Sequence, residues 1–227
     1  MKRFWTDVSV IEGDGGFGIT LDGRPLKTPA KVALTVPTRA LADVIAAEWA
    51  TASETVDPRA MPFTGLANAA TDRAVDDLVA GIVRYAASDQ FCYRAEGPTA
   101  LVERQAEAWD ALLGWARRRY EVDFATCSGV VHVAQPSETL RKLDHAVTML
   151  DPFRLAALSP LVTIGGSLVA GLAVLEKAIP PEAAWEAVSL DEGWQLEKWG
   201  SDAEAEAALD AKRADFLAAA RFLETLS

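Results

Sequence analysis

Residues 155–175 read LAALSPLVTIGGSLVAGLAVL, a run of 21 residues without a charged side chain. A helix of this length could cross a bilayer. The run nevertheless contains serine, threonine, proline and three glycines, and Arg154 and Glu176 flank it, so it is only moderately apolar. It therefore predicts a buried central helix of a globular fold, preceded by a break near Pro160, and no insertion into a membrane.

The N-terminal part of the chain has the pattern of strands. Short apolar runs separated by glycine and proline fill residues 3–36, and Asp22-Gly23 is a two-residue hairpin signal. The spacing Gly13-x-Gly15-x-x-Gly18 fits the dinucleotide-binding fingerprint letter by letter. That fingerprint requires a helix directly after the glycines. A second strand is predicted there, so these glycines indicate a hairpin turn.

From Thr38 onward the pattern is mainly helical. Thr38 can cap the helix that follows it, and apolar residues recur at helical spacing as far as Phe222, with one further strand at Val130 to Val133. The fold class is therefore α+β, a small antiparallel β-rich N-terminal unit followed by a larger α-helical domain. The predicted domains are residues 1–60, β-rich with one helix, and residues 61–227, α-helical.

Charge and cysteine content exclude several classes of protein. The chain has 33 acidic and 22 basic residues and a formal net charge of −11, so it should repel phosphate backbones, and no nucleic-acid partner is expected. Two cysteines, Cys92 and Cys127, are too few for a disulfide framework and indicate a reducing compartment. The N-terminus lacks an apolar signal core, and Asp7 and Glu12 come too early for a typical transit peptide.

Few residues offer chemistry. His132 and His145 are the only histidines, and neither a zinc-ligand spacing nor a phosphate-binding loop is present, so we expect no metal and no cofactor. A nucleophilic pair of Cys92 or Cys127 with either histidine stays open, although the bulky neighbours of Cys92 favour a packed, inert thiol. We find no convergent polar groups and expect no catalytic residue.

Residues 189–200, SLDEGWQLEKWG, predict a complete short helix. Ser189 and Glu192 have the spacing of a capping box, and Gly200 is a natural stop. The apolar residues fall on two nearly opposite sides, around a polar stripe that lies between the two tryptophans. One side holds Leu190 and Trp194, the other Leu196 and Trp199, and the stripe Asp191, Gln195 and Lys198. Such a helix is either enclosed in a core or has one side available to a partner.

Glu48 lies on an apolar helical stripe beside Trp49. An unpaired charge in such a position costs on the order of several kcal/mol. Two interpretations stay open. The first is a structural ion pair with an arginine, for example Arg24, Arg84 or Arg94, and the second is a functional surface acid at the edge of the two units.

Six motifs occur in order and cover essentially the whole chain. They are LDGRPLKTP at 21–29, VPT at 36–38, EW at 48–49, Met61-Pro62 with Leu66-Ala67, CYRA at 92–95, and Gln195 with Lys198-Trp199-Gly200. Each motif alone is weak, but together they resemble the family of assembly chaperones for the catalytic head of the F-type ATP synthase. The resemblance is to the member that holds the α subunit before it joins β. Gly65, Ala69-Ala70 and Gln90-Phe91 depart from the family's pattern and read as tolerated packing variants.

The resemblance implies how the protein works and where it occurs. The family has a β-rich N-terminal unit, a helical C-terminal domain and no enzyme activity, and its partner is the unassembled ATP synthase α subunit. The chain is expected to be monomeric when free and to need no ATP hydrolysis. The family occurs in α-proteobacteria and in mitochondrial matrices. Without a transit-like leader, this chain is expected in the bacterial cytoplasm, or in the matrix if a leader has been removed.

The surface that contacts the client is expected to include acids and tryptophans. These residues would shield an apolar surface that the unassembled subunit otherwise exposes. The predicted partner-binding residues are Glu48, Trp49, Asp191, Glu192, Trp194, Gln195 and Lys198. Two alternatives stay open: a small hydrolase or transferase using a Cys/His pair, and an acidic helical interaction module with another client.

Overall fold

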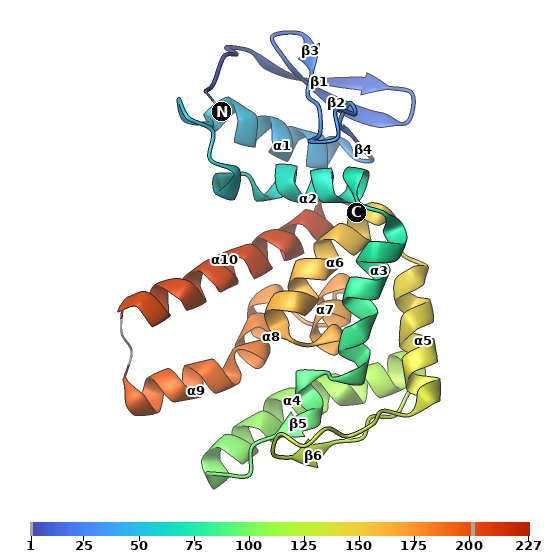
Figure 1. Cartoon of the computed structure of the whole chain (residues 1–227), viewed down its shortest axis with the longest axis vertical. Coiled ribbons are helices and arrows are strands. Elements are labelled where there is room, and N and C mark those ends of the chain that lie inside the picture. The colour runs from blue at the N-terminus through green and yellow to red at the C-terminus, as the bar shows by residue number, and fades with distance from the viewer. Residues whose placement is uncertain (1, 201–202) are drawn as a thin grey trace. The chain divides into compact units, whose positions relative to one another are not determined.

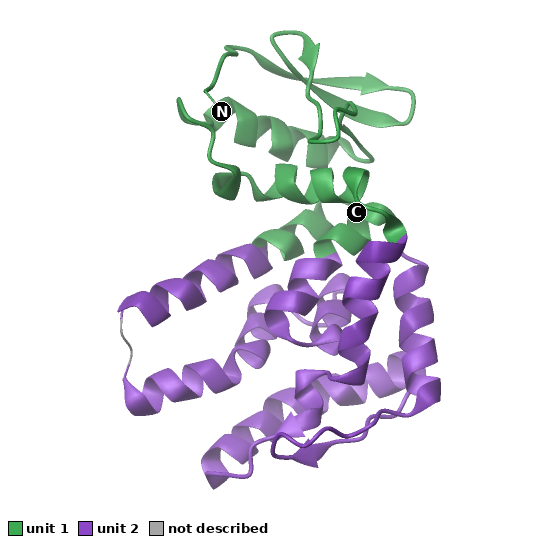
Figure 2. Cartoon of the chain, in the orientation of Figure 1, with its two compact units in different colours: residues 1–75, 151–157, 218–227 green, residues 76–150, 158–217 purple. Residues whose placement is uncertain are grey.

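The computed structural model describes residues 2–200 and 203–227. Strands fill the N-terminal part and helices the rest, so the predicted α+β class is confirmed (Figure 1). Contacts divide the chain into two compact units (Figure 2). Unit 1 comprises residues 1–75, 151–157 and 218–227, and unit 2 comprises residues 76–150 and 158–217. Units grouped by contact need not fold independently, so the domain boundary near residue 60 stays a prediction.

Unit 1 contains a four-stranded antiparallel sheet in which β2 pairs with each of the other strands. The strands are β1 (Val8–Gly13), β2 (Gly16–Leu21), β3 (Arg24–Pro25) and β4 (Thr35–Val36). Asp22 and Gly23 join β2 to β3 with φ angles of 48° and 75°, the left-handed pair that a tight hairpin turn requires. The glycines before β2 also form a hairpin turn, as predicted, and no helix follows them.

Two helices complete the N-terminal part of unit 1 (Figure 1). They are α1 (Arg39–Thr51) and α2 (Pro62–Asp72), with the short 3-10 helix η1 (Pro58–Ala60) between them. The predicted cap is confirmed, because the Thr38 hydroxyl accepts a hydrogen bond of 3.2 Å from the backbone N–H of Leu41. α1 packs against β1 and β2 and also against α2. The indole N–H of Trp5 donates to the carbonyl of Trp49 at 3.1 Å and joins the N-terminal segment to α1.

The remaining elements are mainly helices. They are α3 (Val75–Val83), η2 (Arg84–Ala87), η3 (Gln90–Cys92), β5 (Tyr93–Arg94), α4 (Thr99–Tyr120), β6 (Cys127–Ser128), α5 (Ser137–Thr148), α6 (Pro152–Gly165), α7 (Leu168–Leu175), α8 (Pro181–Val188), α9 (Leu190–Trp199) and α10 (Ala203–Glu224). Helix α4 packs against α7, α8 and α9, and every residue from 168 to 174 of α7 is buried. The predicted buried central helix is therefore present as α7.

The break in the apolar run lies at a different place from the one predicted. α6 continues through Pro160 and ends at Gly165, and the chain turns at Gly166, whose φ is 64°. Pro160 removes one backbone donor, whereas the left-handed conformation of Gly166 cannot continue a right-handed helix. Ser167 then caps α7 by accepting from the N–H of Ala170 at 3.0 Å. Among the described residues, no helix is long and apolar enough to cross a membrane.

A fully buried carboxylate, Asp89, supports the N-terminus of α7 from a distant part of the chain. It accepts hydrogen bonds of 3.0 Å each from the Ser167 hydroxyl and from the backbone N–H groups of Val169 and Phe91. Burial raises the pKa of Asp89 to about 6, against the lowering effect of these donors. The sequence offered no pattern that singled this residue out.

The predicted strand at Val130 to Val133 is absent. The pairing with β5 is made instead by β6, in parallel, and ends at Ser128. Gly129 has a φ of 82° and turns the chain, leaving the side chains of Val130 and Val131 97% and 76% exposed.

Candidate functional site

Helix α9 begins and ends where the sequence predicted, but its N-terminus is not held by a capping box. The hydroxyl of Ser189 donates to the carbonyl of Trp185 at 2.7 Å, so it closes the end of α8 and makes no side-chain cap for α9. Ser189 alone separates the two helices, so it is both the C-cap residue of α8 and the N-cap residue of α9. At the other end, Gly200 has a φ of 79° and donates its N–H to Leu196 at 3.1 Å, which stops the helix.

One side of α9 is fixed to α4 by Trp194. This indole is only 7% exposed. The guanidinium of Arg104 and the ammonium of Lys198 lie 4.9 and 4.8 Å from its ring centroid, within the range of cation–π attraction. Arg104 also forms an ion pair of 2.9 Å with Glu197. Trp194 and Arg104 therefore join α9 to α4, whereas Lys198 belongs to α9 itself and is exposed.

A second, polar contact between α9 and α4 involves Asp191. Its carboxylate accepts a hydrogen bond of 2.7 Å from the side-chain amide of Gln105, which is 1% exposed. The carbonyl of that amide accepts from the N–H of Ala95 at 2.8 Å. The neighbouring Trp109 donates its indole N–H to Ala187 at 2.7 Å and holds the end of α8. Asp191 is thus an anchor of the helix as well as a half-buried acid.

The opposite side of α9 faces outward. The side chain of Trp199 is 86% exposed, although tryptophan is rarely so accessible in a folded protein. Glu192 and Gln195, both predicted as partner-binding residues, are exposed on the same helix. A hollow of about 580 Å³ lies on the other side of α9, next to α4 and α8, with Trp194, Glu197 and Glu186 among its lining residues. The sequence allowed either a fully enclosed helix or one with a side available to a partner. The structure shows the second arrangement, with one apolar side of α9 buried and the other exposed.

Glu48 has a structural partner, but not the predicted one. Its carboxylate accepts from the backbone N–H groups of Phe63 and Thr64, both at 2.8 Å, and from the Thr64 hydroxyl at 2.7 Å. These are the first free donors of α2, whose own N-terminal residue Met61 makes no side-chain cap. No arginine pairs with Glu48 within the part of the chain that the structure describes, and Arg94 pairs with Asp110 at 2.6 Å.

Trp49 takes part in the same arrangement. It is 8% exposed, and its indole N–H donates to the hydroxyl of Thr64 at 3.1 Å. Glu48 is only half-buried and lines a hollow of about 690 Å³ with Val44, Ala47 and Phe63 among its walls. Burial raises the pKa of Glu48, and its three hydrogen bonds oppose that shift.

Neither cysteine is arranged as a nucleophile. Cys92 is fully buried, and burial raises the pKa of its thiol to about 12, away from the thiolate form that reacts. The thiol of Cys127 donates to the carbonyl of Val131 at 3.3 Å, and His132 is hydrogen-bonded to the Tyr93 hydroxyl at 3.1 Å. Over residues 2–200 and 203–227, no thiol is hydrogen-bonded to an imidazole and no group of acids, cysteines and histidines is placed to hold a metal.

Comparison with known proteins identifies the family. The model of the family described as ATP12 chaperone protein matches residues 2–117, just over half of the chain. The chain belongs to the ATP12 chaperone family. The resemblance drawn from the six motifs, to a family of ATP synthase assembly chaperones, is thereby confirmed.

The matched structures extend over the whole length of the chain, and a curated relative extends over most of it. The crystal structure of Atp12 from Paracoccus denitrificans is 41% identical, covers 100% of this chain and 98% of its own, and superposes with a TM-score of 0.93. A protein from Agrobacterium tumefaciens is 39% identical, covers 100% and 86%, and has a TM-score of 0.94. The mitochondrial protein atp12 of Schizosaccharomyces pombe is 26% identical over 88% of this chain and 74% of its own length.

The structure separates the predicted partner-binding residues into two sets. Glu192 and Gln195 are exposed on α9, whereas Trp49 and Trp194 are buried and Asp191 is bonded to Gln105. Sequence reasoning left out Trp199, the most exposed aromatic residue of the helix. Helical geometry had already placed Trp199 opposite Trp194, but it could not tell which of the two sides faced α4.

Proposed function

We propose that this ATP12 protein binds the unassembled α subunit of the F-type ATP synthase and protects its β-facing surface until assembly. The exposure of Trp199 on α9 is the observation that carries this proposal. The inner side of that helix is fixed by Trp194 and Asp191, so the indole is presented on a rigid support. A rigid, exposed tryptophan is the kind of residue that dominates binding at protein interfaces.

Release of the client needs no energy source in this proposal. The permanent contact between the α and β subunits is expected to be larger and more apolar than a contact made by one short helix, and so it displaces the chaperone. The chain accordingly acts without ATP hydrolysis and without catalysis. The suppressed reactivity of Cys92 supports this over the hydrolase alternative.

The remaining predicted residues have supporting roles in the proposed surface. Glu192 and Gln195 flank the exposed side of α9 and offer polar contacts to the client. Asp191 and Trp194 hold the helix against α4, and the exposed Lys198 packs on Trp194 within α9. Glu48 and Trp49 belong to a second part of the proposed surface, in unit 1. There Glu48 lines a hollow, and the buried Trp49 supports Glu48 through its hydrogen bond to Thr64.

We also propose where the protein acts and in what form. The S. pombe relative is mitochondrial, and the matched structures come from bacteria. The bacterial cytoplasm is the proposed compartment, or the mitochondrial matrix if a leader has been removed. The free chaperone is proposed to be monomeric, which sedimentation velocity can measure.

The test replaces Trp199 and measures capture of the client. Trp199→Ala should weaken binding to purified ATP synthase α subunit by at least about tenfold and reduce suppression of its aggregation. The unfolding free energy should change by less than about 0.5 kcal/mol, because the side chain is exposed. Val130→Ala, at another exposed apolar residue of unit 2, is the matched control and should bind like wild type.

Two results would contradict the proposal. Failure of the wild-type protein to bind the α subunit and to delay its aggregation would contradict the proposed client. Unchanged binding by Trp199→Ala would contradict the proposed binding surface on α9. Recovery of a different protein in a cross-linking pull-down, with no α subunit, would favour the acidic interaction module with another client.

A further inference from the structure

A third hollow, of about 620 Å³, lies among the end of α4, α5 and α7 and has an unusual charge for this chain. Four basic side chains and one histidine line it, against two acids, Glu121 and Glu176. The whole chain has the reverse balance, with 33 acids and 22 bases. We call this the basic hollow, and its basic residues are Arg118, Arg119, Arg141, Lys142 and His145.

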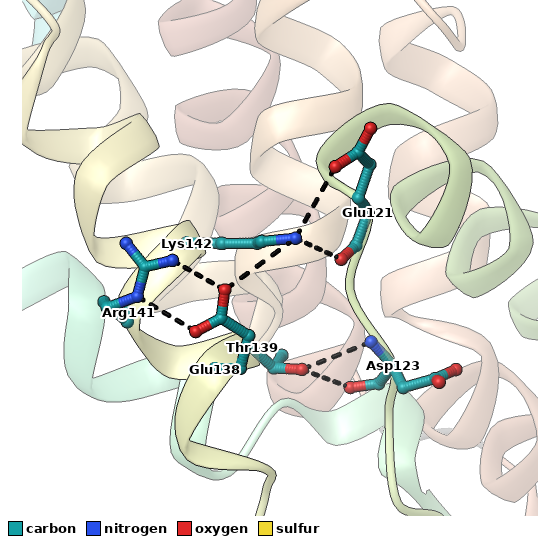
Figure 3. A network of polar contacts seen from close by, with 6 residues as sticks. All are labelled: Glu121, Asp123, Glu138, Thr139, Arg141 and Lys142. Atoms are coloured by element: carbon teal, nitrogen blue, oxygen red, sulfur yellow. Dashed lines mark hydrogen bonds and ion pairs between the residues drawn. The ribbon is translucent and has the colours of Figure 1, made fainter.

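The acids near the basic hollow are already engaged. Glu176 is paired with Arg119 and accepts from the Tyr120 hydroxyl at 2.6 Å. Lys142 lies between two acids, as Figure 3 shows, with its ammonium 2.8 Å from the carbonyl oxygen of Glu121 and 3.6 Å from its carboxylate. Arg119 and Lys142 are therefore already paired within the chain, with Glu176 and Glu121.

Figure 3 also shows how Arg141 is paired with Glu138. Two of its nitrogens bond the carboxylate of Glu138, at 2.6 and 3.0 Å, and Lys142 approaches the same carboxylate at 3.9 Å. About one turn of α5 thus carries Arg141 and Lys142 already paired with acids of the chain.

Two cationic or donor groups of the basic hollow have no acidic partner in the described part of the chain. Arg118 is exposed on the last turn of α4, and its guanidinium lies back over Gly114. His145 is exposed on the last turn of α5. A carboxylate placed in the hollow would find both groups unoccupied.

The floor of the basic hollow is apolar. Leu172 is 1% exposed, and Leu175 and Leu150 border it. Met149, directly after α5, leaves 71% of its surface in solvent. A flexible methionine on an open rim adapts to aliphatic side chains of different shape.

We propose that the basic hollow binds an acidic segment of the client in which a carboxylate side chain lies next to an aliphatic one. The carboxylate pairs with Arg118 and His145, and the aliphatic side chain covers Met149 and Leu175. Charge complementarity selects this occupant, because basic and apolar groups line one concave surface of an acidic protein. The identity of the client rests on the function proposed above, whereas the chemistry of the hollow does not.

The test uses a short peptide, so that it is independent of the α subunit. An acetylated hexapeptide of alternating glutamate and leucine is titrated into the full chain, and binding is read from the NMR shift of the Met149 methyl group. A peptide with lysine in place of glutamate is the matched ligand control. We expect saturable binding of the glutamate peptide only, weakened severalfold at about 0.5 M salt.

Variants then assign the site. Arg118→Glu with His145→Glu should weaken binding of the glutamate peptide about tenfold, because the first change reverses a positive charge and the second adds a negative one. Lys212→Glu reverses the charge of one exposed basic residue on α10, outside the lining of the hollow, and should bind like wild type. Circular dichroism and melting temperature confirm that the variants fold.

The outcomes separate this inference from the function. Equal binding of both peptides, or unchanged binding by the double variant, would overturn the basic hollow as an acidic-segment site. Full displacement of the peptide by equimolar inorganic phosphate would also overturn it, since a small anion would then be the occupant. Failure of wild-type protein to bind the α subunit, with the peptide results intact, would overturn only the proposed client.

Discussion

Glu48 in unit 1 and Asp89 in unit 2 perform the same task with different access to water. Each is a carboxylate that accepts three hydrogen bonds and supports the N-terminus of a helix from another part of the chain, α2 for Glu48 and α7 for Asp89. Asp89 is fully buried, whereas Glu48 is half-buried and lines a hollow. The comparison shows that a carboxylate bound to the N-terminus of a helix can be purely structural in one unit and remain accessible to a ligand in the other.

The largest expected effect comes from removing the buried carboxylate. Asp89→Ala should lower the unfolding free energy by about 3 to 4 kcal/mol, because it leaves two backbone N–H groups and the Ser167 hydroxyl buried without an acceptor. Urea unfolding followed by circular dichroism measures the change. Asp144→Ala, an exposed acid within α5, is the control and should change stability by less than about 0.5 kcal/mol. A similar loss in both variants would contradict the role of Asp89.

Proton uptake by Asp89 should produce the next largest effect. Its pKa is raised from 3.8 to about 6 in the folded state, so the folded chain binds the proton more tightly than the unfolded chain. The stability it contributes is therefore complete below about pH 4 and is lost as the pH rises to about 6, by on the order of 3 kcal/mol. The difference in unfolding free energy between wild type and Asp89→Asn should fall across that window. A flat or rising difference would show that Asp89 is not protonated there.

Removing the accessible carboxylate should cost less. Glu48→Ala is expected to lower the unfolding free energy by about 1 to 2 kcal/mol, because water can reach part of the α2 terminus through the hollow and replace some of the lost bonds. Asp43→Ala, on the same helix, breaks only an exposed pair with Arg39 and should cost less than about 0.5 kcal/mol. A loss as large as that of Asp89→Ala would mean that the two sites do not differ in access to water.

The smallest effect concerns the residue that joins Glu48 to Trp49. Thr64→Val removes a hydroxyl that donates to Glu48 and accepts from the Trp49 indole, and it should cost about 1 kcal/mol. Thr64→Ser keeps the hydroxyl and should be closer to wild type in urea unfolding. A larger loss in Thr64→Ser, which lacks only the γ-methyl group, would mean that packing of this methyl matters more than the hydroxyl bonds.

Local signals explain what the sequence could predict. Asp22-Gly23, Thr38 and Gly200 each act on their immediate neighbours, and the structure confirms the turn, the cap and the stop. The helix at 190–199 and the buried helix at 168–175 also follow from local periodicity. Ser189 shows the limit of such reasoning, because its hydroxyl had two helix ends within reach and bonded the preceding one.

Long-range partners explain what the sequence could not predict. Glu48 was correctly singled out as a costly acid, but its donors are backbone N–H groups of a helix that begins fourteen positions later, and backbone groups leave no mark in a sequence. Asp89 lies in a short connection without periodicity, so nothing distinguished it. The exposed side of α9 depended on where α4 packs, which only the fold decides.

The exposure of Trp199 also provides an optical reporter. The chain has seven tryptophans, and the other six are buried or half-buried. An indole in water emits at longer wavelength and is quenched by added iodide or acrylamide more readily than an enclosed one. The quenchable fraction of the fluorescence therefore comes mainly from Trp199. A decrease in quenching when a client is added would therefore report binding of the client in real time, without a label.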